Sequence, residues 1–194
     1  MRVSSINKIL KTDKPGEKTR SLDLGCGRRP RNPFEADELV GIDIIPAGET
    51  TDGSFTYIQT EIGSELPFMD NAFDAVTGFD FLEHIPRHTH VTGPTASYLD
   101  FVNEIWRVLK PGGYFLAFTP RFPHPASMAD PTHVNFVTTD SHNYISGPAF
   151  ASSLGYGLYA RFETCIAVPV FGWSKLASAS LVGKEIPGPT FFGG

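Results

Sequence analysis

The chain has 194 residues, of which 41% are hydrophobic and 19% charged, a composition that predicts one folded globular domain and excludes a disordered protein. Its 16 basic and 21 acidic side chains give a formal net charge of -5, which excludes the overall basic surface that attracts nucleic acids or anionic membranes. Since two cysteines are too few for a disulfide framework and no apolar run reaches the ~20 residues of a membrane span, we expect a cytoplasmic protein without nucleic-acid or membrane partners.

Two short aliphatic segments near the start predict buried strands. Residues 19–25 end in a glycine turn, and residues 39–45 carry a single charge, Asp43, close to their carboxyl end. Pro30 and Pro33 lie between the two segments, so a helix connecting them would be short or irregular.

The next segments alternate strand with helix. Residues 55–62 and 73–80 predict two further strands, and residues 114–119 a fifth. A helix is expected over residues 96–110, and Pro111 ends it. Its apolar face is formed by Tyr98, Val102, Ile105 and Leu109. Its polar face is formed by Asp100, Asn103, Glu104 and Arg107. This alternation predicts an α/β fold with parallel strands.

The pattern weakens after Pro120, where a segment rich in proline and histidine is typical of a functional loop. A short helix is expected over residues 148–154 and a strand over residues 159–168. Residues 177–182 are expected to form the last strand, at an edge of the sheet.

The glycine pair Gly25 and Gly27 follows the first strand and lets a backbone turn approach a ligand closely. A dinucleotide-binding fingerprint would have a third small residue where this chain has Pro30, so a nicotinamide cofactor is disfavoured. Asp43, at the end of the second strand, is placed to accept the hydroxyls of an adenosine ribose; a capping or solvated carboxylate is the alternative.

Five strings in this order and spacing resemble the class I S-adenosylmethionine (SAM)-dependent methyltransferases. The resemblance is closest to the group that includes ubiquinone-biosynthesis and many small-molecule methyltransferases, and it covers residues 19–120. The strings are LDLGCG (22–27), GIDI (41–44), LPFMDNAFDAV (66–76), FLEHI (81–85) and EIWRVLKPGG (104–113).

The resemblance implies a single-domain, Rossmann-like, doubly wound sheet that is mostly parallel with an antiparallel edge strand. Together with composition, which predicts a basic N-terminal arm (1–18) and a loose C-terminal tail (187–194), this leaves a methyltransferase domain over residues 19–186. Within the domain, residues 19–120 would form the cofactor-binding core and residues 121–147 a loop on the acceptor side.

The resemblance also implies which residues bind SAM. The methionine end would be lined by Asp23, Gly25, Cys26 and Gly27 and bordered by Phe79 and Asp80. Asp43, with Ile44 beside it, would hold the ribose, and Glu61 and Ile62 would contact the adenine. Cys26 is expected to be a small packing residue rather than a reactive one.

Methyl transfer needs alignment of the acceptor with the methyl group and, for a hydroxyl or ammonium, a proton acceptor. His84 and His133 are the candidate bases. The acceptor-side candidates are His124, Asp130, His133, Phe122 and Phe136. A bound metal ion is an alternative for this loop, because it contains three histidines and a carboxylate: His124, Asp130, His133 and His142. Their spacing matches no metal-binding motif, so we expect no metal.

The expected function is transfer of a methyl group from SAM to an oxygen or nitrogen of a small-molecule or saccharide acceptor. One alternative is a SAM-binding partner subunit without catalysis. A weaker one is a nicotinamide-dependent oxidoreductase, which the glycine pattern disfavours.

Overall fold

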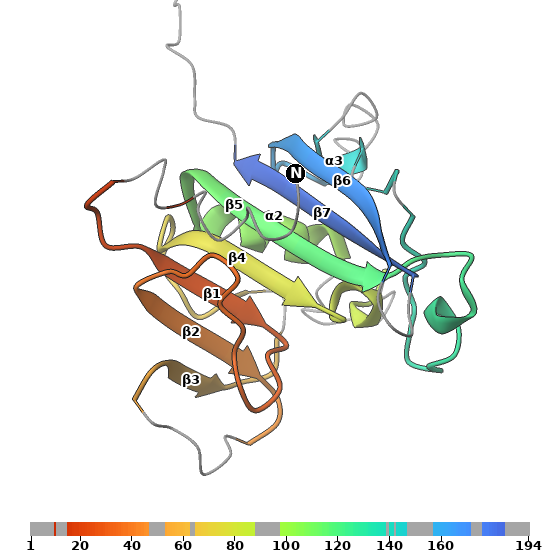
Figure 1. The fold of residues 1–194 in the computed structure, drawn as a ribbon, viewed down its shortest axis with the longest axis horizontal. Helices are drawn as coiled ribbons and strands as arrows, with labels where there is room; N and C mark the ends of the chain where they lie inside the picture. Colours follow the sequence, from red (N-terminus) through yellow and green to blue (C-terminus); the bar gives the residue numbers. More distant parts are fainter. Residues whose placement is uncertain are drawn as a thin grey trace, which may run out of the picture.

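The computed structural model describes residue 10 and residues 15–46, 53–62, 65–87, 98–138, 140–141, 143–146, 157–171 and 176–184. These contain a seven-stranded sheet, two α-helices and two short 3-10 helices (Figure 1). The strands are β1 Arg20–Leu24, β2 Glu38–Asp43, β3 Thr56–Gln59, β4 Phe73–Phe79, β5 Leu109–Pro120, β6 Phe162–Phe171 and β7 Leu176–Lys184. The helices are α2 Tyr98–Val108, α3 Asn143–Ser146, η2 Leu82–His84 and η3 Pro125–Ser127.

The strand order is β3-β2-β1-β4-β5-β7-β6. The first five strands pair in parallel, and β7 is antiparallel to both of its neighbours, β5 and β6. The predicted Rossmann-like α/β class is therefore confirmed.

The expected position of the antiparallel strand was wrong. It was placed at the edge of the sheet, but β7 inserts between β5 and β6, and β6 is the edge strand. The physical reason is that β5 has a free side after pairing with β4, and the strand that fills it is the second strand of the β6–β7 hairpin. Such pairing over a long sequence distance leaves no local signal.

Parallel pairing aligns the carboxyl ends of the central strands. Asp23 of β1 lies opposite Gly41 of β2 on one side and Thr77 of β4 on the other, and Asp43 lies opposite Gln59 of β3. Figure 1 shows the arrowheads of β1, β2, β4 and β5 pointing toward one edge, next to the loop that follows β5. This is the edge at which open α/β sheets bind ligands.

Apolar side chains cover both faces of the sheet. Helix α2 contributes Phe101, Val102 and Ile105 to the main buried cluster, which also contains side chains of β1, β2, β4 and β5. On the other face, Phe34 from the loop after β1 is fully buried, beside Leu10. The residues between β1 and β2 are all described and contain only turns and bends, as the two prolines predicted.

Helix α2 departs from its predicted polar face in two positions. Asn103 and Glu104 were expected off the buried face, but both are buried. Asn103 donates to the carbonyl of Gly157 at 3.0 Å and accepts from the amides of Tyr159 and Ala160 at 2.9 and 3.0 Å. These two side chains are buried because backbone groups from distant segments satisfy them. Residues 96–97 and the helix expected over residues 148–154 lie outside the described residues.

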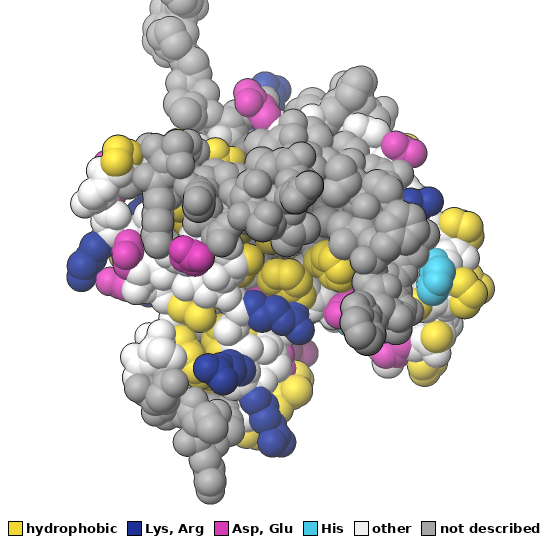
Figure 2. Space-filling model, viewed as in Figure 1, with side chains coloured by type: hydrophobic (Ala, Val, Ile, Leu, Met, Phe, Trp, Pro, Cys, Tyr) yellow, Lys and Arg dark blue, Asp and Glu magenta, His cyan; other side chains and the backbone are white. Residues whose placement is uncertain are grey.

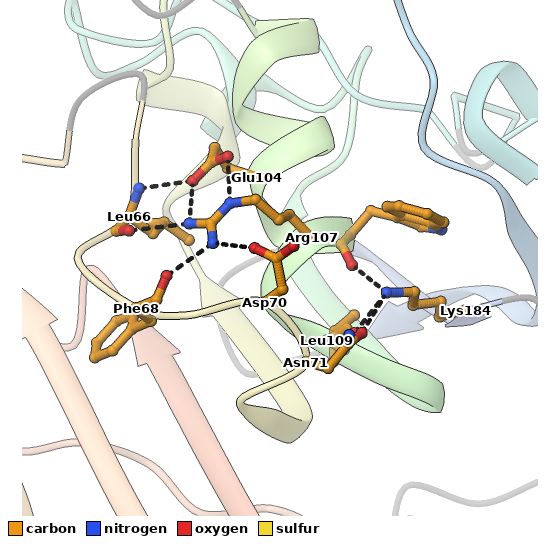
Figure 3. A network of polar contacts seen from close by, with 9 residues as sticks. Leu66, Phe68, Asp70, Asn71, Glu104, Arg107, Leu109 and Lys184 are labelled. Carbon is orange, nitrogen blue, oxygen red and sulfur yellow. Dashed lines mark hydrogen bonds and ion pairs between the residues drawn. The ribbon is translucent and has the colours of Figure 1, made fainter.

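Arg107 joins the end of α2 to the turn before β4 (Figure 3). Its guanidinium contacts both carboxylate oxygens of Glu104 at 2.7 Å, Asp70 at 2.8 Å and the carbonyls of Phe68 and Leu66 at 2.8 and 3.0 Å. Glu104 in turn accepts from the amide of Leu66 at 2.8 Å. The network thus connects two of the five family strings, 66–76 and 104–113.

Lys184, the last residue of β7, makes a similar connection. Its ammonium group donates to the carbonyls of Leu109 and Trp106 at 2.7 and 3.0 Å and to Asn71 at 3.0 Å (Figure 3). Burial lowers the pKa of Lys184. The end of β7 is therefore attached to the junction between α2 and β5.

We predict that Arg107→Ala lowers the free energy of unfolding by about 3 kcal/mol, because it leaves the buried Glu104 carboxylate without its cation. Arg107→Lys should have a smaller effect because it keeps a cation beside Glu104, but it should still destabilise because an ammonium cannot make the bidentate contact. Urea unfolding followed by circular dichroism measures both. Arg29→Ala, at an exposed arginine, is the control and should change stability by less than about 0.5 kcal/mol. An Arg107→Ala protein as stable as the control would contradict the prediction.

Candidate functional site

The turn after β1 and the end of β2 form the centre of the candidate site. Gly25 and Gly27 have φ values of +60° and +62°, in the left-handed region that favours glycine. The amide of Gly27 donates to Asp43 at 2.7 Å, and the amide of Ile45 donates to the other carboxylate oxygen at 2.9 Å. Asp43 is only 7% exposed, yet each oxygen keeps a lone pair for a further donor.

The two glycines have different surroundings. A Cβ at Gly25 would overlap the ring of Phe81, whereas a Cβ at Gly27 would have no atom within 4 Å. Gly25 therefore allows Phe81 to pack on the turn, and Gly27 leaves the turn open to solvent. A third glycine, Gly41 in β2, lies under Pro30, whose ring leaves no room for a Cβ there. Thus the proline-bearing segment that replaces the first helix packs directly on β2.

Asp23 is fully buried in the middle of the sheet. The hydroxyl of Thr77 donates to one of its oxygens at 2.6 Å, and the amide of Arg31 donates to the other at 2.8 Å. Burial raises the pKa of Asp23 to about 6, and these hydrogen bonds only partly offset the effect.

Cys26 is buried, and its amide donates to the carbonyl of Ile42 at 3.2 Å. Burial raises the pKa of its thiol to about 12, and the carboxylates of Asp23 and Asp43 add to the rise. Because the thiolate is the reactive form, a thiol buried in this way is expected to pack rather than react.

The other predicted cofactor residues lie at the same edge. Glu61 and Ile62 follow β3 directly after Thr60, whose amide donates to the carbonyl of Asp43 at 2.9 Å. Glu61 is exposed, whereas Ile62 packs against the core. Phe79 ends β4, and Asp80 follows it with a φ of +49°, a left-handed conformation that aspartate tolerates better than most residues. Ile44 is 65% exposed, beside Asp43.

The loop between β1 and β2 adds positive charge that the sequence analysis did not assign. Arg28, Arg29 and Arg31 are exposed there, and Figure 2 shows dark blue side chains over the region where this loop lies in Figure 1. The guanidinium of Arg31 stacks 4.8 Å from the ring centre of Phe79. In the sequence, the arginines that follow LDLGCG were the signal that could have placed a positive charge at the site. A run of arginines is, however, more often a solvated surface.

His84 and His133, the candidate bases, are brought together although 49 positions separate them. Their ring centres are 4.8 Å apart. Nδ1 of His84 is 2.9 Å from the hydroxyl of Thr132, and this hydroxyl donates to Asp130 at 2.6 Å. Nδ1 of His133 is 3.0 Å from the carbonyl of Ser127. Glu83, which is 1% exposed, lies beside the two histidines. Glu83, His84 and His133 each offer one possible metal-ligand atom, and these three atoms lie within 4.8 Å of one another.

The remaining acceptor-side residues do not all join this cluster. Nδ1 of His124 accepts from the amide of Ala126 at 3.2 Å and caps η3. Phe122 and Phe136 are exposed, with ring centres 5.6 Å apart. His142 lies outside the described residues.

A cavity of about 680 Å³ opens next to the loop after β5. Its lining includes Arg87, Tyr98, Asn135, Phe136 and Tyr144 but none of the predicted cofactor residues. The loop is tied to η2 because the carbonyl of Glu83 accepts from the amides of Val134 and Asn135 at 2.8 and 3.0 Å. The cavity therefore adjoins the histidine cluster through Asn135.

Known proteins match the region that contains this site. Residues 22–117 match the family model described as a methyltransferase domain. The demethylmenaquinone methyltransferase of Bacillus pumilus is 32% identical over 132 residues, 60% of this chain and 52% of that protein. The sterol methyltransferase-like 2 of Botryococcus braunii is 27% identical over 180 residues, 80% of this chain and 42% of that protein.

The solved 1,6-didemethyltoxoflavin-N1-methyltransferase of Burkholderia thailandensis, with bound S-adenosylhomocysteine, has the same fold. It superposes with a TM-score of 0.61 at 17% identity over 95% of this chain and 78% of that one.

Residues 22–117 thus form a methyltransferase domain of the class I, SAM-dependent type, and the predicted resemblance is confirmed. Its relatives include demethylmenaquinone methyltransferases of Bacillus pumilus and Bacillus subtilis, which are 32% and 33% identical over the matched regions. The chain spans about half the length, or less, of the curated relatives it matches. In the part of the chain that the structure describes, no helix has the length and apolar character to cross a membrane.

We predict that Gly25→Ala is more damaging than Gly27→Ala. Both changes strain a left-handed backbone, at a cost of about 1 kcal/mol, but only the first also displaces the Phe81 ring. Gly25→Ala should therefore destabilise by roughly 2 kcal/mol or more. Thermal unfolding of the two variants beside wild type compares them directly; equal losses would refute the role of Phe81.

The buried Asp23 predicts a pH-dependent stability. In the unfolded chain its carboxyl loses its proton near pH 3.8, but in the folded protein only near pH 6. The folded state is therefore favoured below pH 4, and this contribution, roughly 3 kcal/mol, is lost as the pH rises through 6.

Asp23→Asn should remove this dependence and raise the free energy of unfolding at pH 7 by up to about 3 kcal/mol. Urea unfolding at pH 4, 5, 6 and 7 measures the effect, with Glu65→Gln, at an exposed carboxylate beyond β3, as the control. A wild-type protein and an Asp23→Asn variant with parallel pH profiles would contradict the prediction.

Proposed function

We propose that this chain binds SAM at the turn after β1 and transfers its methyl group to a small-molecule acceptor. The observation that carries the proposal is the geometry of Asp43. Its buried carboxylate is oriented by the amides of Gly27 and Ile45 and retains one lone pair on each oxygen, which suits the two vicinal hydroxyls of a ribose.

The remaining cofactor contacts follow from position along the sheet edge. The adenine would lie toward Glu61 and Ile62, after β3, and the methionine end toward the turn at Gly25. The ammonium group of the methionine suits Asp23, because a nearby cation favours the charged form of that carboxyl. Arg31, stacked on Phe79, is the proposed partner of the methionine carboxylate.

The acceptor would enter from the side of the loop after β5. The adjoining cavity has aromatic walls in Tyr98, Phe136 and Tyr144 and polar groups in Arg87 and Asn135, a composition that suits a small organic molecule. The toxoflavin-precursor and demethylmenaquinone methyltransferases act on small molecules by name, which supports the same class here. His84 and His133 stay predictions as proton acceptors, and so do oxygen or nitrogen as the acceptor atom.

Isothermal titration with SAM, S-adenosylhomocysteine and NADH tests the cofactor. We expect 1:1 binding of the first two and no binding of NADH. Asp43→Ala should weaken the affinity for SAM by roughly 30-fold or more. The reason is that two charge-assisted hydrogen bonds, worth at least about 2 kcal/mol together, are lost. Glu65→Ala, at an exposed position beyond β3, is the control and should bind as wild type. Circular dichroism confirms that the variants are folded.

Wild-type affinity in a folded Asp43→Ala protein would overturn the proposed cofactor site. Formation of S-adenosylhomocysteine with a panel of phenols, quinols and saccharides tests turnover. A protein that binds SAM but methylates nothing on the panel would favour the alternative of a silent partner subunit, and binding of NADH alone would favour an oxidoreductase.

A further inference from the structure

The hydrogen bonds around the histidine cluster determine which ring nitrogens carry protons. The carbonyl of Ser127 can only accept, so Nδ1 of His133 must donate to it. The hydroxyl of Thr132 uses its one hydrogen in a hydrogen bond to Asp130. It must therefore accept a hydrogen bond from the protonated Nδ1 of His84. Asp130 accepts this hydrogen bond through a carboxylate oxygen, and its other carboxylate oxygen lies 4.0 Å from Nε2 of His133.

In the neutral form, both rings therefore keep their lone pair on Nε2. This is the arrangement of metal-binding histidines, which donate the other ring N–H to a carbonyl or, through a hydroxyl here, to a carboxylate. Such partners orient the ring and increase the basicity of the ligating nitrogen.

Glu83 adds a carboxylate from the same 3-10 helix as His84. Its position relative to His133 is set by main-chain bonds, since its carbonyl accepts from the amides of Val134 and Asn135. Each of Glu83, His84 and His133 offers one ligand atom within 4.8 Å of the other two. Neighbouring ligands in a tetrahedral zinc site with bonds of about 2.0 Å lie about 3.3 Å apart, so the ligand atoms would have to approach one another by up to about 1.5 Å when zinc binds.

We propose that Glu83, His84 and His133 bind a divalent zinc ion, with a fourth position left open on the acceptor side. Two imidazoles and one carboxylate are a ligand set of catalytic zinc sites. The spacing of the chain predicted no metal because two of the three ligands are adjacent and the third lies 49 positions beyond His84, so only the folded loop assembles the site. While zinc is bound, Nε2 of either histidine is a ligand and not a proton acceptor.

Zinc binding to the 194-residue chain, stripped of metal and free of any polyhistidine tag, tests the proposal. We expect saturable 1:1 binding in competition with a chromophoric chelator, and a visible absorption band with cobalt(II) as a spectroscopic substitute. His133→Gln and His84→Gln should each weaken zinc by at least about 100-fold, because loss of a ligand exceeds the 10–100-fold effect of losing a second-shell partner. His124→Gln, a histidine of the same loop outside the cluster, is the matched control.

The zinc affinity of a Thr132→Val variant distinguishes the proposed site from adventitious zinc binding at the surface, which this substitution would not change. It keeps all three ligands but removes the acceptor of the His84 ring N–H, and should weaken zinc by about 10-fold. Thr132 is exposed, so the variant is expected to fold and keeps the test informative if a ligand variant does not. The absence of 1:1 binding, or wild-type affinity in the folded His84→Gln, His133→Gln or Thr132→Val proteins, would overturn the proposal.

Discussion

The parallel pairing of β1 with β2 on one side and β4 on the other is the constraint on which the site depends. It aligns three strand ends at one edge of the sheet and so brings Asp23, Asp43 and Asp80 to the same place. The turn after β1 then passes between Phe81 and Asp43, where Gly25 leaves room for the Phe81 ring and both Gly25 and Gly27 adopt a positive φ. This arrangement buries the carboxylate of Asp23 in the sheet, and removing the charged carboxylate from water is unfavourable.

Buried polar side chains of α2 hold the connecting segments in position. Asn103 binds the backbone that leads into β6, and Glu104 with Arg107 binds the turn before β4. A helix that buried only apolar side chains would leave those backbone groups without partners. These connecting segments, which have little regular structure, are therefore attached to α2 by hydrogen bonds whose directions are specific.

The proposed acceptor side differs from the proposed cofactor side in how its residues are positioned. The predicted cofactor residues follow successive strands, whereas the histidine cluster joins η2 to a loop that closes on itself through the pairing of Arg121 with Val137. Its ring nitrogens are oriented by Thr132, Asp130 and the carbonyl of Ser127, none of which needs a strand. A loop of this kind changes easily between related enzymes while the sheet remains, so acceptor chemistry varies on a common cofactor-binding core.

The sequence alone was sufficient for the positions of the first five strands along the chain and their parallel pairing, the class of fold, the irregular first connection and the family. These depend on local patterns: aliphatic runs ended by glycine, prolines that exclude a helix, and the strings around Gly25, Asp43 and Pro111. Only the tertiary structure placed β7 inside the sheet, buried Asn103 and Glu104, packed Phe81 on Gly25 and joined Glu83 and His84 to His133. Each of these is a contact between residues far apart in the chain, whose free energy depends on which groups meet after folding, and no local pattern of residues encodes that meeting.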